Sequence, residues 1–534
     1  MAWTRAALAL VAAGVVGLVL VSGGSVADPR TPPALPGLPP PFLGTAVVGS
    51  GGVTAAIDAY GDVADLRAPG PAGRTLIDNP SARQAAGSVP ADTGIAPRVS
   101  VAGAPALPLW RADSVSQRYL PGTNAVRTVA RFGAVRVTIV YAARGRQLAC
   151  RIEIEGGAEV LISGEARAAR RLHCEDGAAR GILTGAARAD RRWLARARPL
   201  GPGAPAWARH MYGRSLLTLR ALTDARTGAV AAGARDGWAY VWPRDAATAA
   251  LAYAAAGYRP EARRVAGFLL DLDLGTAARF HGDGSPVPGR AAQGDAAGWV
   301  AVAARAAGLP PGSLRRPQLD SADYQEGAPG RYVANVIAAI GLGGEPPAPM
   351  HGPSPTRRRE ETRLKSRFVT AAGIMREPDA RSGLDSAAAW VVRPFALPLL
   401  YPPARRTLLH LAGVGASGPP ASRFGIVPSE HWPGVDPWTA PTAWSAWSLA
   451  ALAIRESAHP TAARRDRGAA VGLLADLRRA ATPAGALPER VDARTGIPTS
   501  TTPLAWSAAF AVLALRELWP QEARRPPVRD GASG

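Results

Sequence analysis

Residues 240–257, which read YVWPRDAATAALAYAAAG, decide the fold class of this chain. Pro243 suits the first turn of a helix, where its missing N–H costs no hydrogen bond, and Gly257 suits the position just after a helix. The stretch therefore predicts a helix from Arg244 up to this glycine. Arg244 and Asp245 stand at its start, directly behind aromatic residues, so the same stretch also predicts polar and aromatic groups at a ligand site.

Helical patterns continue from about residue 205 almost to the C-terminus, and we expect no strands there. About eleven segments are separated by loops rich in glycine and proline. Many antiparallel helices of similar length fit a closed toroid of helix pairs, although the pattern alone does not separate a toroid from an irregular bundle. Besides the helix above, the clearest predicted helices cover residues 295–307 with Asp295 as the N-cap, 333–341, 384–397, 442–454, 471–480 and 504–518.

The preceding part of the chain alternates with a period of two from about residue 42 to 190. Val135, Val137, Ile139 and Tyr141 are apolar, for example, and polar residues stand between most of them. Such alternation is typical of half-buried antiparallel strands. We therefore predict an N-terminal antiparallel β-sandwich over residues 42–195, followed by an all-α (α/α)6 toroid over residues 196–520.

The N-terminal residues predict export. Met1 to Arg5 is a short basic start, Ala6 to Val21 is an apolar run, and residues 25–27 (SVA) offer a cleavage site of small residues. This is the pattern of a signal peptide. The apolar run is shorter than the roughly 20 residues of a spanning helix, but an uncleaved N-terminal anchor stays open. We expect a secreted or extracytoplasmic, membrane-anchored protein, with residues 1–27 as signal peptide or anchor.

The remaining boundaries follow from composition and compartment. Residues 28–41 form a proline-rich linker, and residues 521–534 form a disordered tail. Export permits a disulfide between Cys150 and Cys174, while two buried thiols are the alternative.

Composition excludes several function classes. The net charge is +21, and nearly all of it comes from arginines spread evenly along the chain. No run combines basic residues with interleaved aromatics, so no nucleic-acid partner is expected. The cysteines and histidines lack the spacing of a zinc site, and Lys365, the single lysine, follows no glycine-rich phosphate loop. We expect no metal, no cofactor and a monomeric chain.

Chemistry-bearing residues gather in the loops between the predicted helices. Aromatic rings stack on sugar faces, and Arg, Asp and Glu bind hydroxyl groups, so such loops suit a carbohydrate site. Glu326 and Glu489 are isolated loop carboxylates, and a glycosidase needs one carboxylic acid and one carboxylate. A solvated or helix-capping role is the alternative for both glutamates. The loops are 237–245 (GWAYVWPRD), 323–326 (DYQE), 428–438 (PSEHWPGVDPW), 487–492 (LPERVD) and 503–507 (PLAWS).

The order of these motifs resembles glycoside hydrolase family 15, whose members include glucoamylase-like, glucodextranase-like and trehalase-like proteins. The resemblance covers roughly residues 210–515, and YVWPRDA, LPERVD and PLAWS are its most specific parts. A β domain before the helices also fits bacterial members. The matching stretches are the run from Arg214 to Ala246, AAQGDAAGW at 291–299, SADYQEG at 321–327, LDSAAAW at 384–390, FGIVPSEHWPGVDPW at 424–438 and LPERVDARTGIPTSTTPLAWSAAF at 487–510.

The resemblance implies roles for individual residues. Glu326 resembles the general acid and Glu489 the general base of an inverting enzyme, whose carboxyl groups lie about 6.5–9.5 Å apart. Arg244 and Asp245 match the pair that binds hydroxyls of the sugar at the non-reducing end. The other residues that we expect to bind substrate are Trp242, Asp323, Tyr324, Trp438 and Trp506.

The chain also departs from the family pattern. Gln325 stands where the family usually has tryptophan before the acid. Gly327 replaces a second acidic residue, and Ile426 or Val427 replaces a substrate-binding arginine. These changes remove an aromatic platform and a hydroxyl clamp, which should weaken the first sugar subsite.

The prediction from the sequence is therefore an exported, inverting, exo-acting glycoside hydrolase that cleaves α-glucosidic bonds from non-reducing ends, in the manner of a glucoamylase. Its expected partner is an α-glucan or an α-glucosidic oligosaccharide. Two alternatives stay open. The same fold could act on trehalose or an α-1,6-glucan, or the chain could be a catalytically degenerate protein that binds carbohydrate or the cell envelope.

Overall fold

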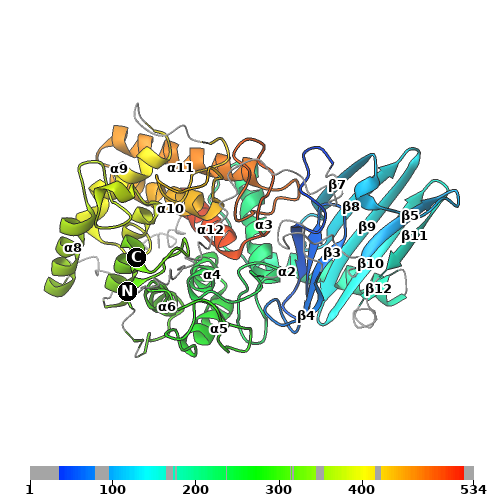
Figure 1. Cartoon of the computed structure of the whole chain (residues 1–534), viewed down its shortest axis with the longest axis horizontal. Coiled ribbons are helices and arrows are strands. Elements are labelled where there is room, and N and C mark those ends of the chain that lie inside the picture. The colour runs from blue at the N-terminus through cyan, green and yellow to red at the C-terminus, as the bar shows by residue number, and fades with distance from the viewer. Residues whose placement is uncertain are drawn as a thin grey trace, which may run out of the picture.

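The structure, a computed structural model, consists of a β-rich N-terminal region followed by a helical region (Figure 1). It describes residues 35–78, 95–163, 172–174, 177–235, 237–312, 314–315, 318–343, 354–414 and 422–521. The predicted signal peptide or anchor, about half of the proline-rich linker and nearly all of the predicted tail lie outside the described residues. Among the described residues, the helices are all too short or too polar to cross a membrane.

The strands of the N-terminal region form separate sheets. One sheet has the order β1-β2-β3-β4, a second the order β12-β10-β9-β8-β7, and a third the order β11-β5-β6. The strands are β1 (Gly44–Gly49), β2 (Thr54–Asp58), β3 (Val63–Ala68), β4 (Arg74–Asp78), β5 (Ala96–Val101), β6 (Leu107–Pro108), β7 (Ser114–Tyr119), β8 (Val126–Phe132), β9 (Val135–Arg144), β10 (Gln147–Glu155), β11 (Ala158–Ser163) and β12 (Leu172–Cys174), with a 3₁₀ turn η1 (Leu109–Arg111) after β6.

Alternation along β9 explains how the second sheet packs. Val137, Ile139 and Tyr141 are buried in a core shared with β1, β2 and β3. Val140 faces the opposite side, where it contacts a small cluster that includes Ala186 of helix α2 (Gly177–Leu194). The sheet is therefore covered on both faces, one by strands and the other by a helix.

Two expectations for this region are wrong. The period of two does not extend to residue 190, because residues 177–194 form α2, in which Ala179, Ile182 and Ala186 recur at helical spacing. The sheets are also not wholly antiparallel, since β12 pairs with β10 in parallel. That pairing puts Cys150 and Cys174 in register, and their sulfur atoms are bonded in a disulfide.

The helical region begins at α3. Its helices are α3 (Ala206–Ala221), α4 (Pro243–Ala256), α5 (Arg259–Leu270), α6 (Ala296–Ala306), α7 (Val333–Leu342), α8 (Pro355–Phe368), α9 (Tyr401–Leu411), α10 (Thr439–Arg455), α11 (Pro460–Ala480) and α12 (Ala505–Leu518), with 3₁₀ helices η2 (Ala380–Ser382), η3 (Ser386–Val391) and η4 (Pro398–Leu400). The prediction for α4 is confirmed, since Pro243 opens the helix and Gly257 follows it in the left-handed conformation.

Three other expectations for the helical region need correction. The helix expected over 384–397 is only the short η3, because prolines at 394 and 398 remove the N–H groups that a longer helix needs. α11 begins eleven residues earlier than the predicted Val471, at Pro460. The expectation of no strands is wrong, because β13 (Asp320–Ser321) and β14 (Gly330–Arg331) form a short hairpin.

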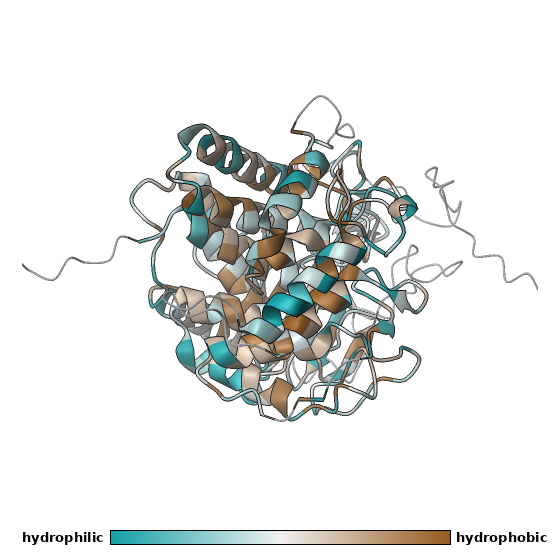
Figure 2. Cartoon of the chain, turned by 90° about the vertical axis from the view of Figure 1, so that its left-hand side faces the viewer, coloured by the Kyte–Doolittle hydropathy of each residue, from teal (hydrophilic) through white to brown (hydrophobic). Residues whose placement is uncertain are grey.

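Six elements follow one another around the middle of the helical region. α4 contacts α6, α6 contacts α7, α7 contacts η3, η3 contacts α10, α10 contacts α12, and α12 contacts α4 again. The remaining helices pack outside this ring, such as α5 against α4 and α11 against α10. Figure 2 views the helical region from its end, where hydrophobic and hydrophilic bands alternate along the helices. This banding is expected of helices with one face on a core.

Large aromatic side chains fill the middle of the ring. The rings of Trp299 and Trp390 meet edge to face at 5.0 Å, and Trp390 meets Trp444 in the same way at 5.4 Å. Trp444 also contacts Phe510 at 5.5 Å. Each edge-to-face pair of this kind contributes about 0.5–1.5 kcal/mol of stability beyond the burial of its surface. The centre of the ring is therefore a packed core.

The β-rich region is attached to the helical region through α3, which contacts β1. The hydroxyl of Thr54 donates to the carbonyl of Ala221 at 3.2 Å, and Asn124 Nδ2 donates to the carbonyl of Leu217 at 3.0 Å. The buried guanidinium of Arg214 donates to the carbonyl of Thr123 at 2.8 Å. These bonds satisfy polar groups that the contact between the two regions would otherwise leave without partners.

Candidate active site

Three helices of the ring, α4, α10 and α12, begin at one cavity of about 100 Å³. Trp242, Trp438 and Leu504 line it, and these residues are the N-caps of α4, α10 and α12. Segments far apart in the sequence therefore meet where three helices start. The full lining is Ala232, Gly237, Trp238, Trp242, Arg244, Asp245, Arg290, Tyr324, Gln325, Glu326, Trp438, Glu489, Leu504 and Trp506.

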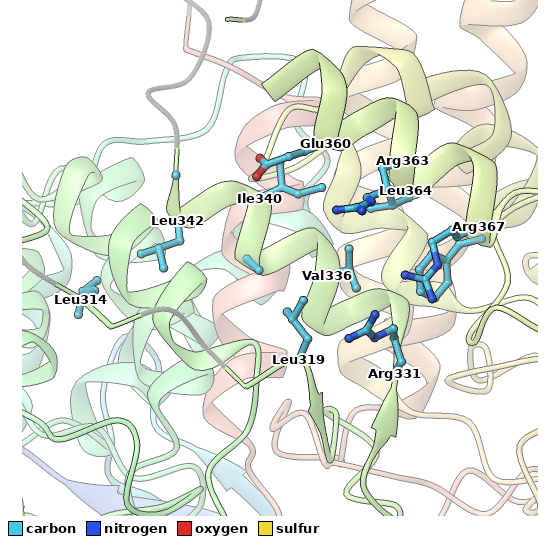
Figure 3. Close-up of a pocket in the computed structure, with 13 residues that line it drawn as sticks. Leu314, Leu319, Arg331, Val336, Ile340, Leu342, Glu360, Arg363, Leu364 and Arg367 are labelled. Atoms are coloured by element: carbon cyan, nitrogen blue, oxygen red, sulfur yellow. The ribbon is translucent and has the colours of Figure 1, made fainter. Parts of the chain in front are cut away.

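A larger cavity of about 420 Å³ lies elsewhere, between α7, α8 and the β13–β14 hairpin (Figure 3). Its floor is aliphatic, with residues such as Val336 and Ile340, and arginines stand at its edge. It contains none of the residues singled out from the sequence. The chemistry that the sequence predicts therefore belongs to the smaller cavity.

Glu326 ends the tight turn that begins at Asp323, since its N–H donates to the Asp323 carbonyl at 2.9 Å. Its φ of +56° is left-handed, a conformation that is costly for a residue with a side chain. The indole N–H of Trp242 donates to Oε1 at 2.9 Å, and Arg290 forms an ion pair with Oε2. The side chain is 32% exposed. Strain held at an exposed, polar side chain is typical of functional positions.

Glu489 is held more firmly than Glu326. Its backbone N–H donates to Thr501 at 2.9 Å, and its carbonyl accepts the N–H of Thr439 at 3.0 Å. Oε1 accepts from the indole of Trp238 at 3.3 Å, and Oε2 accepts from the hydroxyl of Ser500. Both carboxylate oxygens are thus fixed in direction, which suits a group that must take a proton from a positioned water.

Arg244 and Asp245 occupy the first turn of α4, where both side chains are buried. Arg244 forms an ion pair with Asp295 at 2.8 Å, and its guanidinium lies 4.7 Å from the ring centre of Trp506. Asp295 is the N-cap residue of α6, as expected, but its side chain bonds Arg244 and makes no cap hydrogen bond to the helix. The cation at the first turn of α4 attracts this carboxylate more strongly than a neutral N–H does.

Asp245 is poised to bind a hydroxyl group. Burial, reinforced by the charges of Asp295 and Glu489 and opposed by Arg244, raises the pKa of Asp245 to about 7. Its Oδ2 is buried and accepts no hydrogen bond from the residues that the structure describes. Arg244 lies 3.6 Å from this oxygen, too far for a good hydrogen bond, so a ligand hydroxyl could still donate to it.

The turn that carries Glu326 rests on a buried polar network. Tyr324 places its hydroxyl 2.9 Å from Oδ1 of Asp385, and Gln325 Nε2 donates to Oδ2 of the same carboxyl at 3.1 Å. Burial and the neighbouring charge of Asp323 raise the pKa of Asp385 to about 7. Asp323 pairs with Arg376 at 3.2 Å. Tyr324 reaches the cavity, whereas Asp323, which we expected to bind substrate, is not among the lining residues.

The three departures from the family pattern have different consequences. Gln325 lines the cavity, but its amide nitrogen is engaged with Tyr324 and Asp385. A Cβ at Gly327 would meet Arg376 and Tyr332 at ordinary contact distance, so the site has room for a Cβ without a clash. Ile426 is buried in the core beside Trp438 and supplies no polar group to the cavity.

Two aromatic or charged lining residues, Trp238 and Arg290, were not predicted individually. Trp238 lies inside the quoted GWAYVWPRD loop, so its aromatic character was a signal that could have identified it. Arg290 stands directly before the quoted stretch 291–299 but is not part of it. The sequence therefore reveals Trp238 only as part of a motif and does not reveal Arg290.

Comparison with known proteins agrees with this placement. Residues 206–276 match the model of the family described as glycosyl hydrolases family 15. Over this stretch the chain is similar to glycoside hydrolase family 15; the stretch runs from α3 to the loop after α5 and includes Trp242, Arg244 and Asp245. No curated protein matches the chain.

Three solved structures are distantly similar. The glucoamylase from Saccharomycopsis fibuligera has 16% identity and a TM-score of 0.43, over 60% of this chain and 97% of that chain. The glucoamylase from Hormoconis resinae has 14% identity and a TM-score of 0.44, over 59% and 74% of the two chains. The family 15 glucoamylase from Hypocrea jecorina has 15% identity and a TM-score of 0.42, over 57% and 70%.

Proposed function

We propose that this chain is an inverting glycoside hydrolase that removes a terminal sugar from an α-glucoside. The observation that carries the proposal is that Glu326 and Glu489 line one cavity, although they belong to different loops. Arg244 and Asp245 line the same cavity and offer polar groups for hydroxyls, and Trp242 and Trp506 offer aromatic faces. We also infer that the ring of helices is the inner layer of an (α/α)6 toroid, and that the sheets form a sandwich.

In the proposed reaction, Glu326 gives its proton to the glycosidic oxygen as the bond from that oxygen to C1 of the sugar breaks. Glu489 takes a proton from a water whose oxygen bonds to C1 on the opposite face. The products are the free sugar with inverted configuration and the protonated leaving alcohol. The proton now on Glu489 returns to Glu326 through solvent, so the site is restored and no cofactor is consumed.

The size of the cavity favours action at a chain end. Its volume of about 100 Å³ is well below the roughly 300–1,000 Å³ of sites that enclose drug-sized ligands. Such a space suits one sugar ring better than an internal stretch of polysaccharide. This fit supports exo-action, with the non-reducing-end sugar against Arg244 and Asp245.

The test is release of glucose, with its anomeric form followed by NMR, from maltose, isomaltose, trehalose, soluble starch and dextran. β-Glucose from any of these, lost in Glu326→Gln and in Glu489→Gln, is the expected result and identifies the linkage. Glu360→Gln is the matched control, because Glu360 lines the other, larger cavity. Trehalose should give α- and β-glucose in equal amounts, because only the attacked ring inverts. α-Glucose as the first product from soluble starch or dextran, or full activity in either active-site variant, would refute the proposal.

A second candidate is a carbohydrate-binding protein without catalysis. The ion pair between Arg290 and Glu326 favours it, because a guanidinium stabilises the charged carboxylate whereas a general acid must hold a proton. This candidate predicts unchanged sugar affinity in Glu489→Gln and weaker affinity in Trp242→Ala. No glucose release from the five substrates, together with that pattern of affinities, would favour it over hydrolysis.

We further propose that the protein works outside the cytoplasm, secreted or held by its N-terminal segment, and as a monomer. The bonded Cys150 and Cys174 support export, because disulfides persist in oxidising compartments. Cell fractionation with the full chain, combined with light scattering of the purified protein, tests both points.

A further inference from the structure

Arg279 lies beside the cavity and has no carboxylate partner among the residues that the structure describes. Its guanidinium lies 4.8 Å from the ring centre of Tyr240 and 5.7 Å from that of Trp242. It donates one hydrogen bond, at 3.3 Å, to the carbonyl of Gly237. Its Nε is buried and has no hydrogen-bond partner among the described residues. The charge is therefore held by aromatic faces and one carbonyl, with donor capacity left over.

Arg290 reaches the same place from the other limb of one folded loop. The N–H of Val287 donates to the carbonyl of Arg279 at 2.9 Å, and the N–H of Ala278 donates to the carbonyl of Arg290 at 3.1 Å. These bonds bring the two arginines next to one another at the cavity. The pKa of Arg290 is lowered, first by burial and then by the charge of Arg279, which shows that the two cations affect each other.

Near Glu326, two arginines face too little negative charge once this glutamate is protonated for catalysis. Arg290 has Glu326 as its ion-pair partner, and Arg279 pairs with no carboxylate among the described residues. A general acid must be protonated before it can act, and a protonated Glu326 leaves the more distant charge of Glu489 as the negative charge that acts on Arg290. Two neighbouring cations repel each other, and a partly buried site screens this repulsion less than water does, so an anion bound between them is stabilised by both charges.

We propose that the substrate carries an anionic substituent, a carboxylate or a phosphate, on its leaving group, and that Arg279 and Arg290 bind it. This inference rests on the proposed hydrolase function and names the substrate class of the same site. Arg290 lines the cavity and pairs with Glu326, the proposed proton donor to the leaving oxygen, so the substituent sits on the leaving side of the scissile bond.

Binding of the anion also prepares the acid. Arg290 exchanges Glu326 for the substituent, and the carboxyl of Glu326 then takes up the proton that it later gives to the glycosidic oxygen. Neutral glucosides leave the ion pair intact and should be poor substrates. A loose aglycone specificity would instead arise if Arg290 served only to hold Glu326 in place.

The experiment compares three α-D-glucosides of similar size, the neutral 2-hydroxyethyl glucoside, the carboxymethyl glucoside and the 2-phosphoethyl glucoside. Calorimetric affinities are measured in the Glu489→Gln background, so that no substrate is consumed. We expect at least one charged glucoside to bind about tenfold more tightly than the neutral one, since hydrogen bonds to charged groups contribute about 1.5–3 kcal/mol. The larger gain identifies carboxylate or phosphate as the preferred anion.

Substitution of the arginines separates charge recognition from support of the fold. Arg290→Gln and Arg279→Gln should each remove most of the preference for the charged over the neutral glucoside, measured as the ratio of their affinities. Arg290→Lys should keep part of this preference, and added salt should reduce it. Arg290 is 42% exposed, so Arg290→Gln should fold. Equal affinities for charged and neutral glucosides in the Glu489→Gln protein would overturn the inference. So would a preference for the charged glucosides that survives both arginine substitutions.

Binding of glycolate and inorganic phosphate, without any sugar, distinguishes failure of the inference from failure of the proposed function. If these anions bind weakly, and about tenfold more weakly after either Gln substitution, the anion site stands even where no α-glucoside is hydrolysed. If the anions bind independently of the arginines while neutral glucosides are hydrolysed, the hydrolase stands and the inference falls.

Discussion

The indole N–H of Trp242 donates a 2.9 Å hydrogen bond to Oε1 of Glu326, across 84 positions of sequence. Trp242 is the residue directly before α4, and Glu326 ends a strained turn before α7. The aromatic wall of the cavity and the proposed general acid are thus coupled. Trp242 orients a carboxyl group as well as offering a surface to a sugar.

Replacing this donor should affect turnover more than binding. We predict that Trp242→Phe lowers kcat about tenfold with a small change in KM, because the ring remains while a hydrogen bond to a charged group is lost. Trp506→Phe is the matched control, since the Trp506 indole nitrogen has no hydrogen-bond partner among the described residues. Steady-state kinetics on the best substrate compare the two variants. Equal kcat in Trp242→Phe and Trp506→Phe would contradict the orienting role.

The left-handed backbone at Glu326 should cost stability. Glycine adopts positive φ without steric penalty, so Glu326→Gly should be more stable than Glu326→Ala by about 1 kcal/mol, while both variants are inactive. Both substitutions remove the same side-chain contacts, so their difference isolates the backbone. Urea unfolding measures it. A less stable glycine variant would show that φ at this position is not strained.

Ser500 should assist Glu489 without touching the sugar. Its hydroxyl donates to Oε2 of Glu489, and we predict that Ser500→Ala lowers kcat about tenfold and leaves KM nearly unchanged. Thr501→Val is the control next to it, because the buried hydroxyl of Thr501 has no hydrogen-bond partner among the described residues and valine has the same shape. An effect of Thr501→Val as large as that of Ser500→Ala would point to packing as the cause.

Asp385 should make the folded state lose stability as the pH rises. Its pKa is about 7 in the folded chain and 3.8 for an ordinary carboxyl, so between these values the folded chain holds a proton that the unfolded chain releases. This contribution is fully present below pH 3.8 and is lost as the pH rises through 7.

Asp385→Asn tests this linkage, because the amide cannot titrate. From pH 5 to pH 8 the wild type should lose roughly 2–3 kcal/mol more of its free energy of unfolding than the variant does. Urea midpoints at the two pH values give the comparison, and the contribution of Asp245 cancels because both proteins contain it. Parallel pH profiles would rule out Asp385 as the titrating group.

Local signals in the sequence were sufficient to predict the type and ends of single helices and strands. Pro243 and Gly257 set the limits of α4 because the preferences of proline and glycine act within a single turn. The alternation over β9 predicted a strand because successive side chains of a strand point to opposite faces of the sheet. Most of the candidate site residues also lie at one cavity, because the motifs that drew attention to them are the loops at the starts of the inner helices.

Local preference was insufficient where a distant partner binds a side chain. Asp295 occupies the N-cap position of α6, but Arg244 binds its side chain, because an ion pair outweighs a cap hydrogen bond. Substrate binding by Asp323 stays a prediction, and in the structure its carboxylate pairs with Arg376. Residues 177–194 form α2 and no strand, and α2 packs its apolar side chains on the outer face of β9.

The sequence by itself determined the order of a β-rich and a helical region, the ends of the best-capped helix, and the residue types available for chemistry. These depend on periodicity and backbone preference, which neighbouring residues fix among themselves. Only the tertiary structure decided that Glu326 meets Trp242 and Arg290, and that Glu489 meets Ser500 and Trp238. Such contacts depend on the packing of helices far apart in the chain, where hydrogen-bond geometry and charge compensation are settled in space.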